Sequence, residues 1–184
     1  MIAKVGIITV SDRASRGERD DESGLLLRAL VEGAGAEVAA YRVLPDEEVI
    51  LAHALRDLAD TCFCDLIFTT GGTGLSPRDH TPEATRAVID REIPGIAEAL
   101  RASAQKKTPF AMLSRAVAGV RGRTLIINLP GSPGAVQDAF QVLKPVLKHA
   151  VELIQGRVKD CRDSHRREHR EKTWTEQSPI SRRL

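Results

Sequence analysis

The chain has 184 residues, the size of one domain, and 42% of them are hydrophobic, which is enough for a buried core. Only 3% are aromatic, so the core is aliphatic, and no apolar run approaches the ~20 residues of a membrane-spanning helix. The chain starts directly with a strand-like segment that lacks the features of a signal peptide, and its three cysteines suit a reducing compartment, so we expect a cytoplasmic protein.

Apolar patterns alternate along the chain between strand-like and helix-like segments. Short apolar runs predict strands at 3–10, 37–44, 65–70 and 124–129. Apolar residues at helical spacing predict helices at 22–34, 46–60, 81–91, 94–105 and 134–155. Thr81 is expected to cap the third of these, with Pro82 at its first helical position. The segment 117–123 is expected to turn at Gly122 and pair antiparallel with the last strand.

This alternation predicts a three-layer α/β/α fold, with a mostly parallel sheet covered by helices on both faces and an antiparallel hairpin at its edge. The predicted domain covers 1–155. The charged extension 156–184 holds nine Lys and Arg against five Asp and Glu and has few apolar residues, so it is not expected to join the core. Cys62 and Cys64 are expected to be two buried thiols beside a strand, because no second Cys or His pair has zinc-site spacing.

Four predicted strands are each followed by a loop of small, polar or acidic residues. Parallel strands place such loops at one edge of the sheet, where open α/β sheets bind their ligands. The first loop contains Ser11 and Asp12, and the second contains Asp46. The third contains Gly71, Gly72, Thr73 and Gly74 and continues to Asp79, and the fourth contains Pro130, Gly131 and Ser132.

The two glycine-rich loops are suited to phosphate, because glycine lets a ligand approach backbone N–H groups closely. Neither loop matches the Walker A or the dinucleotide-binding pattern, so those two enzyme classes have little support. The alternative is that both loops are only tight turns with helix caps.

The acidic residues of these loops suit a metal that accompanies a nucleotide. Asp46 and Asp79 could hold Mg²⁺ together with phosphate oxygens, with Asp12 as a weaker third candidate. Alternatively, Asp46 caps the helix that follows it, Asp79 braces its own loop through Arg78, and Asp12 pairs with Arg13.

Arginines near these loops could bind phosphate groups in a bidentate way. The candidates are Arg13, Arg78 and Arg115, each of which could equally be an ordinary surface residue. No arrangement of Ser, His, Asp or Cys suggests covalent catalysis.

Taken together, these motifs resemble the MogA/MoaB family of molybdenum-cofactor biosynthesis and the related N-terminal domain of gephyrin. The resemblance covers about 3–155 and rests on motifs that occur in order: Ser-Asp-Arg-Ala-Ser at 11–15, Leu-Pro-Asp-Glu at 44–47, Thr-Thr-Gly-Gly-Thr-Gly at 69–74, Pro-Arg-Asp-His-Thr-Pro-Glu-Ala-Thr at 77–85, Leu-Ser-Arg at 113–115 and Asn-Leu-Pro-Gly-Ser-Pro at 128–133.

The resemblance implies a molybdopterin-binding fold and molybdopterin adenylyltransferase activity, in which AMP passes from MgATP to the terminal phosphate of molybdopterin. It also implies a trimer, with a hexamer as the alternative, and a separate partner protein that inserts molybdate. Family roles carry over to Asp46 and Asp79 as functional aspartates. The two glycine loops, Ser114 and Arg115 carry over as nucleotide or pterin contacts.

Two other functions remain open from the sequence. A non-catalytic pterin-binding or scaffold protein would need no pair of aspartates. Nucleic-acid binding through the basic extension has little support, because Trp174 is its only aromatic residue.

Overall fold

The computed structural model describes residues 3–158 and contains one sheet of six strands in the order β2-β1-β3-β6-β5-β4. The strands are β1 Lys4–Val10, β2 Glu37–Leu44, β3 Leu66–Thr70, β4 Arg91–Glu92, β5 Ala118–Arg121 and β6 Thr124–Leu129. Strands β2, β1, β3 and β6 run parallel to one another. Strand β5 pairs antiparallel with β6, and β4 pairs antiparallel with β5. The predicted parallel sheet and its antiparallel hairpin are therefore confirmed.

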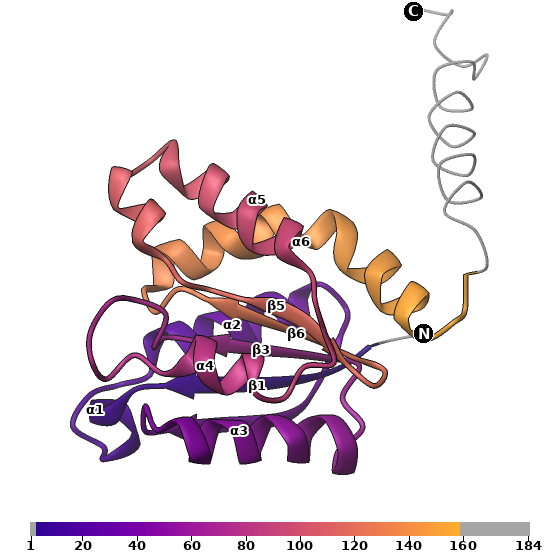
Figure 1. Ribbon diagram of the computed structural model, residues 1–184, viewed down its shortest axis with the longest axis horizontal. Helices are drawn as coiled ribbons and strands as arrows, with labels where there is room; N and C mark the ends of the chain where they lie inside the picture. The colour runs from indigo at the N-terminus through magenta and orange to yellow at the C-terminus, as the bar shows by residue number, and fades with distance from the viewer. Residues whose placement is uncertain (1–2, 159–184) are drawn as a thin grey trace, which may run out of the picture.

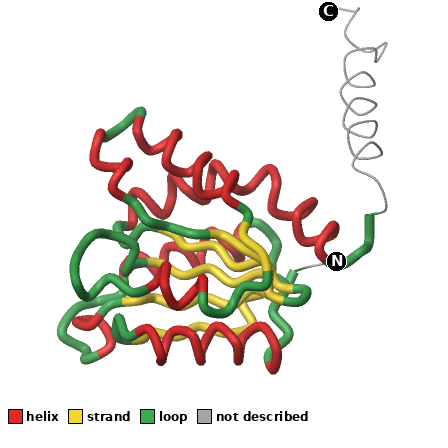
Figure 2. The backbone as a smooth tube through the Cα atoms, in the orientation of Figure 1, coloured by secondary structure: helices red, strands yellow, loops and turns green. Residues whose placement is uncertain are grey.

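Helices cover both faces of the sheet (Figure 1). They are α1 Asp12–Ser15, α2 Glu22–Gly33, α3 Glu48–Arg56, α4 Thr81–Arg86, α5 Pro94–Gln105 and α6 Pro133–Ile154, with a π-helical turn at Asp57–Thr61 and a 3₁₀ helix at Pro109–Leu113. Figure 2 shows the strands as a layer between two groups of helices, which is the three-layer arrangement that the sequence predicts.

Side-chain alternation along the strands produces two cores, one on each face of the sheet. Ile7 and Phe68 face the core that packs against α2, α5 and α6, whereas Ile8 and Ile67 face the core under α3 and α4. All four side chains are fully buried, as expected for parallel strands covered on both faces.

The strand order reverses direction between β1 and β3. From β1 the chain crosses to β2 on one side, and from β2 it returns to β3 on the other side of β1. The loops that leave β1 and β3 therefore diverge, which opens a crevice at the carboxyl edge of the sheet.

Several predicted element boundaries were wrong. The helix expected at 81–91 ends at Arg86, and the chain then forms β4, a short strand that pairs outside β5. Thr81 is the first helical residue and not the cap, which is His80. The helix expected at 46–60 begins at Glu48 and finishes as the π-helical turn.

The extension predicted at 156–184 lies almost wholly outside the described residues. Cys62 and Cys64 are both free thiols; Cys64 is buried as predicted, whereas Cys62 is only partly buried, so that half of the prediction was wrong. Within residues 3–158, no helix combines the length and the apolar character that crossing a membrane requires.

Candidate functional site

The loop after β3 begins with two glycines in left-handed backbone conformations. Gly71 has φ of 101° and Gly72 has φ of 62°. A Cβ on Gly71 would lie 2.3 Å from the carbonyl oxygen of Val10, at the end of β1. Only glycine allows the loop to pass this close to the neighbouring strand.

Gly72 and Gly74 leave room for two carboxylates. A Cβ on Gly72 would lie 2.4 Å from Asp46 Oδ2, and a Cβ on Gly74 would lie 2.9 Å from Asp79 Oδ2. The glycine loop therefore packs directly against the two aspartates that the sequence nominates. Asp46 comes from the loop after β2, whereas Asp79 lies further along the same loop as the glycines.

Asp46 is a buried carboxylate that does not cap the helix after it. The cap of α3 is Glu47, so the capping alternative is wrong. Asp46 is 6% exposed, and its Oδ1 accepts a hydrogen bond of 2.8 Å from the backbone N–H of His80. Burial raises the pKa of Asp46, the negative charges of Asp79 and Asp12 act in the same direction, and the His80 N–H opposes them.

Asp12 joins the first loop to both aspartate-bearing loops. Its Oδ1 accepts the backbone N–H of Asp46 at 3.1 Å, and its carboxylate accepts two hydrogen bonds from Arg78, at 2.9 and 3.1 Å. These bonds, that of Arg78 first, lower the pKa of Asp12. Asp12 thus pairs with Arg78 and not with Arg13.

Asp79 braces its own loop, as the alternative interpretation expected, but it does so without Arg78. Its Oδ2 accepts the backbone N–H of Ser76 at 2.7 Å. This bond uses one of the four lone pairs that a carboxylate offers, so Asp79 retains acceptor capacity toward a ligand.

Arg115 holds the glycine loop from behind. Its Nε donates to the carbonyl of Gly74 at 2.7 Å, and one terminal nitrogen donates to the carbonyl of Asp79 at 2.6 Å. The other terminal nitrogen forms an ion pair with Glu83. These three partners give Arg115 a loop-fixing position and use three of the five N–H donors of its guanidinium, and the predicted phosphate contact stays a prediction.

The two glycine-rich loops lie against each other. A Cβ on Gly131 would lie 3.2 Å from the Cα of Gly71, and Thr70 Oγ1 donates to the carbonyl of Pro130 at 2.7 Å. Ser132 is the N-cap of α6. We call Gly71 and Gly131, with their facing backbones, the glycine ridge.

Asn128 is a buried site-supporting residue that the sequence reasoning missed. Its Nδ2 donates to Thr69 Oγ1 at 3.0 Å and to Thr85 Oγ1 at 2.9 Å, and its Oδ1 accepts the N–H of Val117. The sequence feature that could have revealed it is the amide side chain of Asn128 within the otherwise apolar run 125–129. A buried amide needs several partners, which predicts that such a residue joins neighbouring elements.

Two cavities border the glycine-rich loops. The larger, of about 380 Å³, lies between α5, the 3₁₀ helix and α6, and Thr73, Gly74, Ser114 and Pro130 are among the residues that line it. The smaller, of about 200 Å³, is bordered by Ser11 and by the ridge itself. Residues of both glycine-rich loops therefore border both cavities, whereas neither Asp46 nor Asp79 is among the lining residues of either one.

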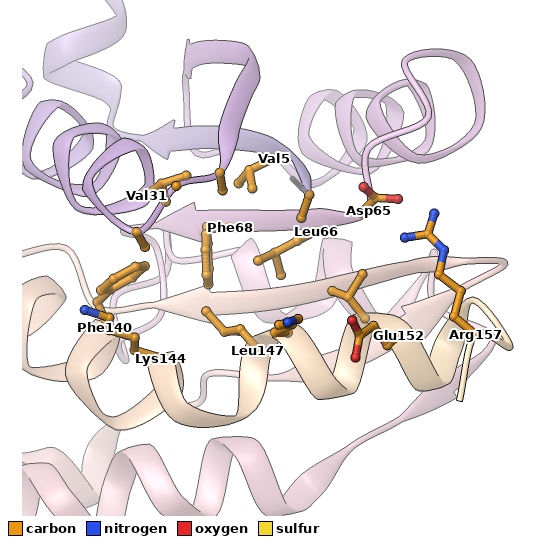
Figure 3. Close-up of a pocket in the computed structure, with 16 residues that line it drawn as sticks. Val5, Val31, Asp65, Leu66, Phe68, Phe140, Lys144, Leu147, Glu152 and Arg157 are labelled. Atoms are coloured by element: carbon orange, nitrogen blue, oxygen red, sulfur yellow. The ribbon is translucent and has the colours of Figure 1, made fainter. Parts of the chain in front are cut away.

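A third cavity lies far from these motifs, at the amino ends of the strands (Figure 3). It has a volume of about 260 Å³, an apolar floor that includes Val5, Leu66 and Phe68, and a rim that includes Lys144 and Arg157. None of the predicted site residues lines it.

The carboxylates fit a magnesium ion only if a substrate supplies the remaining ligands. In residues 3–158 no group of three or more His, Cys, Asp and Glu side chains could hold a metal by itself. Mg²⁺ in phosphoryl-transfer sites characteristically takes one or two carboxylates together with phosphate oxygens and water. Asp46 and Asp79, which lie against the same glycine loop, match that donor set.

Comparison with known proteins places this arrangement in a family. Residues 6–149 match the family described as "Probable molybdopterin binding domain". The chain is 38% identical over 154 residues to the molybdopterin adenylyltransferase of Helicobacter pylori strain J99, with 83% of this chain and 88% of that protein covered. It is 40% identical over 161 residues to the molybdenum cofactor synthesis protein cinnamon of Drosophila melanogaster, and that match covers 87% of this chain and 27% of cinnamon.

Solved structures agree with the sequence matches. The molybdopterin biosynthesis enzyme MoaB of Thermus thermophilus superposes with a TM-score of 0.80 at 54% identity, covering 84% of this chain and 98% of that one. The Mog protein of Mycobacterium ulcerans superposes with a TM-score of 0.79 at 44% identity, covering 83% and 99%. The fold, the loop motifs that occur in the family's order and these matches show that the chain belongs to the molybdopterin-binding domain family of molybdenum-cofactor biosynthesis.

Proposed function

We propose that the chain is a molybdopterin adenylyltransferase, which transfers AMP from MgATP to the terminal phosphate of molybdopterin and releases pyrophosphate. The observation that carries the proposal is the packing of two aspartates, Asp46 and Asp79, against a glycine loop that borders two cavities. Relatives named molybdopterin adenylyltransferase, of which this chain covers most of the length, support it.

The reaction needs positioning more than it needs a base. A phosphate oxygen of molybdopterin attacks the α-phosphorus of ATP, a new P–O bond forms, and the bond to the pyrophosphate oxygen breaks. The nucleophile is already an anion, which explains why no nucleophile–base pair is required. Binding both substrates with their phosphates in line can supply most of the acceleration.

The glycine ridge is suited to bringing the two phosphates together. Gly71 and Gly131 line the smaller cavity, and Thr73 and Gly74 of the same loop line the larger one, so substrates in the two cavities would have their phosphates near one short stretch of backbone. Backbone N–H groups near the start of α6 favour anions there. Bound Mg²⁺ would neutralise charge on the phosphates, and Asp46 and Asp79 are the residues that would hold it.

The test is an assay of AMP transfer with MgATP and molybdopterin, on the parent chain and on Asp79→Asn. The amide oxygen of the variant can still accept the Ser76 N–H, so the loop is preserved while the charge is lost. We expect transfer to fall at least about a hundredfold, as when a preorganised charge is removed from an active site, with pterin binding retained. Glu32→Gln, which affects an exposed ion pair on α2, is the control and should be fully active.

Two results would contradict the proposal. Full activity of Asp79→Asn would remove that carboxylate from the mechanism. A parent chain that binds molybdopterin but forms no pyrophosphate would instead favour the non-catalytic binding or scaffold role.

The assembly and the partners belong to the same proposal. We infer a homotrimer, a molybdate-inserting partner protein that receives the adenylylated product, and a cytoplasmic location, all on the strength of the family membership. Sedimentation of the purified chain tests the oligomeric state.

A further inference from the structure

The cavity at the amino ends of the strands lies between the sheet, α2 and α6 (Figure 3). Its floor is apolar and includes Val5 of β1 and Leu66 and Phe68 of β3, whose side chains are at most 4% exposed. None of the residues nominated for adenylyl transfer lines this cavity. A ligand bound here would therefore be separate from the substrates of the proposed reaction.

Small residues at the end of α2 leave this space unfilled. The helix ends at Gly33, and the turn after it lines the cavity with Ala34, Gly35 and Ala36. A Cβ on Gly35 would meet no atom within 4 Å, so the wall is open at this point. Water fills an apolar space poorly, because each water molecule needs several polar partners. The cavity is therefore suited to an apolar ligand.

Helix α6 makes the cavity long and narrow. Its lining residues lie on one face of the helix at helical spacing, and they are Phe140, Lys144, Leu147, Lys148, Val151 and Glu152. From the first to the last of them this face is roughly 16 Å long, by the rise of an α-helix. The volume of about 260 Å³ lies below the usual range of about 300–1,000 Å³ for small-molecule sites. A space of this length and volume fits an unbranched chain better than a fused ring system.

Two lysines place positive charge along one part of the cavity. Lys144 and Lys148 lie one turn apart on α6, and within residues 3–158 neither forms an ion pair with an acidic side chain. Both are exposed, so their ammonium groups reach water while their stems cover the apolar lining. Two unpaired cations beside an apolar space favour a ligand with an anionic head.

The opposite end of the cavity is less suited to an anion. Asp65, Glu152 and Arg157 line it there, as Figure 3 shows. Two carboxylates against one guanidinium give this end a net negative charge. An anionic head is therefore directed to the lysines, and the apolar body of the ligand lies along the floor.

We propose that this cavity binds an unbranched medium-chain carboxylate, with its carboxylate at Lys144 and Lys148 and its alkyl chain along Leu66, Phe68 and Phe140. Burial of the alkyl chain supplies most of the affinity. The two lysines select an anionic head over a neutral or cationic one. Because the ligand contacts both the sheet and α6, it stabilises the folded chain.

The test measures binding of octanoate to the full chain by calorimetry. 1-Octanol and octylammonium are the comparison probes, since they have the same chain length and a different head charge. Octanoate should bind at one site per chain and raise the Tm, as any ligand of the folded state does. 1-Octanol should bind roughly tenfold more weakly, the effect of two exposed ion pairs, and octylammonium more weakly still.

Substitutions test the two parts of the cavity separately. Lys144→Gln combined with Lys148→Gln should weaken octanoate binding roughly tenfold and leave 1-octanol binding unchanged. Lys106→Gln, which changes an exposed lysine that does not line the cavity, is the control and should bind both probes as the parent does. Ala36→Leu places a larger side chain in the cavity and should abolish binding of both probes. Its Tm without ligand shows whether it folds, because added volume can destabilise a core.

The inference is overturned by any of three results. One is octanoate binding that does not saturate or that occurs at several equal sites. Another is 1-octanol or octylammonium binding as tightly as octanoate. The third is parent-like octanoate binding by the double lysine variant or by a folded Ala36→Leu variant. None of these results depends on AMP transfer, so failure of this inference and failure of the proposed function can be told apart.

Discussion

The carboxyl of Asp46 lies in a less polar environment than any of the surface aspartates. Its raised pKa in the folded protein means that the folded state holds this proton more tightly than the unfolded chain does. The contribution of Asp46 to stability therefore falls as the pH rises above its unfolded pKa of about 3.9. Such a residue is retained at a cost to stability, which is common at functional sites.

Asp46→Asn should therefore raise the Tm at pH 7 relative to the parent, and the gain should vanish below about pH 3.5, where the parent carboxyl is protonated in both states. The asparagine oxygen can still accept the N–H of His80. Thermal unfolding between pH 3 and 8 measures the effect.

The matched control for Asp46 is Asp57→Asn. Arg42 lowers the pKa of Asp57 through a hydrogen bond, so this replacement should lower the Tm at pH 7, and the loss should disappear as the pH falls. If both variants changed the Tm at pH 7 in the same direction, burial would not be the cause of the raised pKa of Asp46.

Arg115 is expected to matter for stability as well as for the site. Arg115→Ala removes charge-assisted bonds to two carbonyl oxygens and leaves Glu83 without its partner. We expect a loss of roughly 1.5–3 kcal/mol in the free energy of unfolding, the range for hydrogen bonds to charged groups, as measured by denaturant titration. Lysine cannot reproduce the three-way contact and should recover only part of it.

The control for Arg115 is Arg16→Ala, which breaks an exposed ion pair with Glu18. Its effect should stay within about 0.5 kcal/mol. Equal effects at positions 115 and 16 would show that Arg115 is an ordinary surface residue.

At the residue scale, the sequence indicates which side chains gather and not what each of them contacts. Asp12, Asp46 and Asp79 were all nominated from loop composition. The Asp12–Arg78 pair joins residues 66 positions apart, and no local pattern shows it. The contacts of Arg115 could not be predicted either, because two of its partners are backbone carbonyl oxygens, which every sequence contains.

The glycine loop after β3 is the element on which the whole site depends. Gly71→Ala forces a side chain into φ of 101° and within 2.3 Å of the Val10 carbonyl. Backbone strain alone costs about 1–3 kcal/mol, and we expect at least that loss in the free energy of unfolding together with loss of AMP transfer.

Gly33→Ala in α2 is the comparison for the glycine loop, because a Cβ there meets nothing within 4 Å. It should be neutral or stabilise by up to about 1 kcal/mol. If Gly71→Ala were equally harmless, the close contact between β1 and the loop would not be required.

Regular elements were predicted well where hydrophobic periodicity spans many residues. The strand at 37–44 and the helix at 94–105 have the predicted bounds. Periodicity failed at 81–91, because Val88 and Ile89 continue the apolar pattern after the helix has ended at Arg86. Those two side chains pack on the α3 core from a turn, which a helical pattern cannot distinguish from another helical turn.

Over the whole molecule, the described elements complete one sheet and two cores between Ala3 and Val158. We therefore expect that removal of 159–184 leaves the Tm within about 2 °C of that of the full chain and leaves AMP transfer unchanged. Differential scanning calorimetry and the transfer assay check both. A large loss in either would assign a structural or catalytic part to the extension.

The two ends of the described chain lie at the edge of the sheet away from the glycine ridge. Ala3 and Arg157 border the same cavity at the amino ends of the strands, and Figure 1 shows the start of β1 close to the end of α6. A polypeptide joined at either end would thus leave from the edge of the sheet opposite the two cavities beside the glycine-rich loops. This geometry is compatible with fusion to further domains, as in cinnamon, where the matching region makes up 27% of the protein.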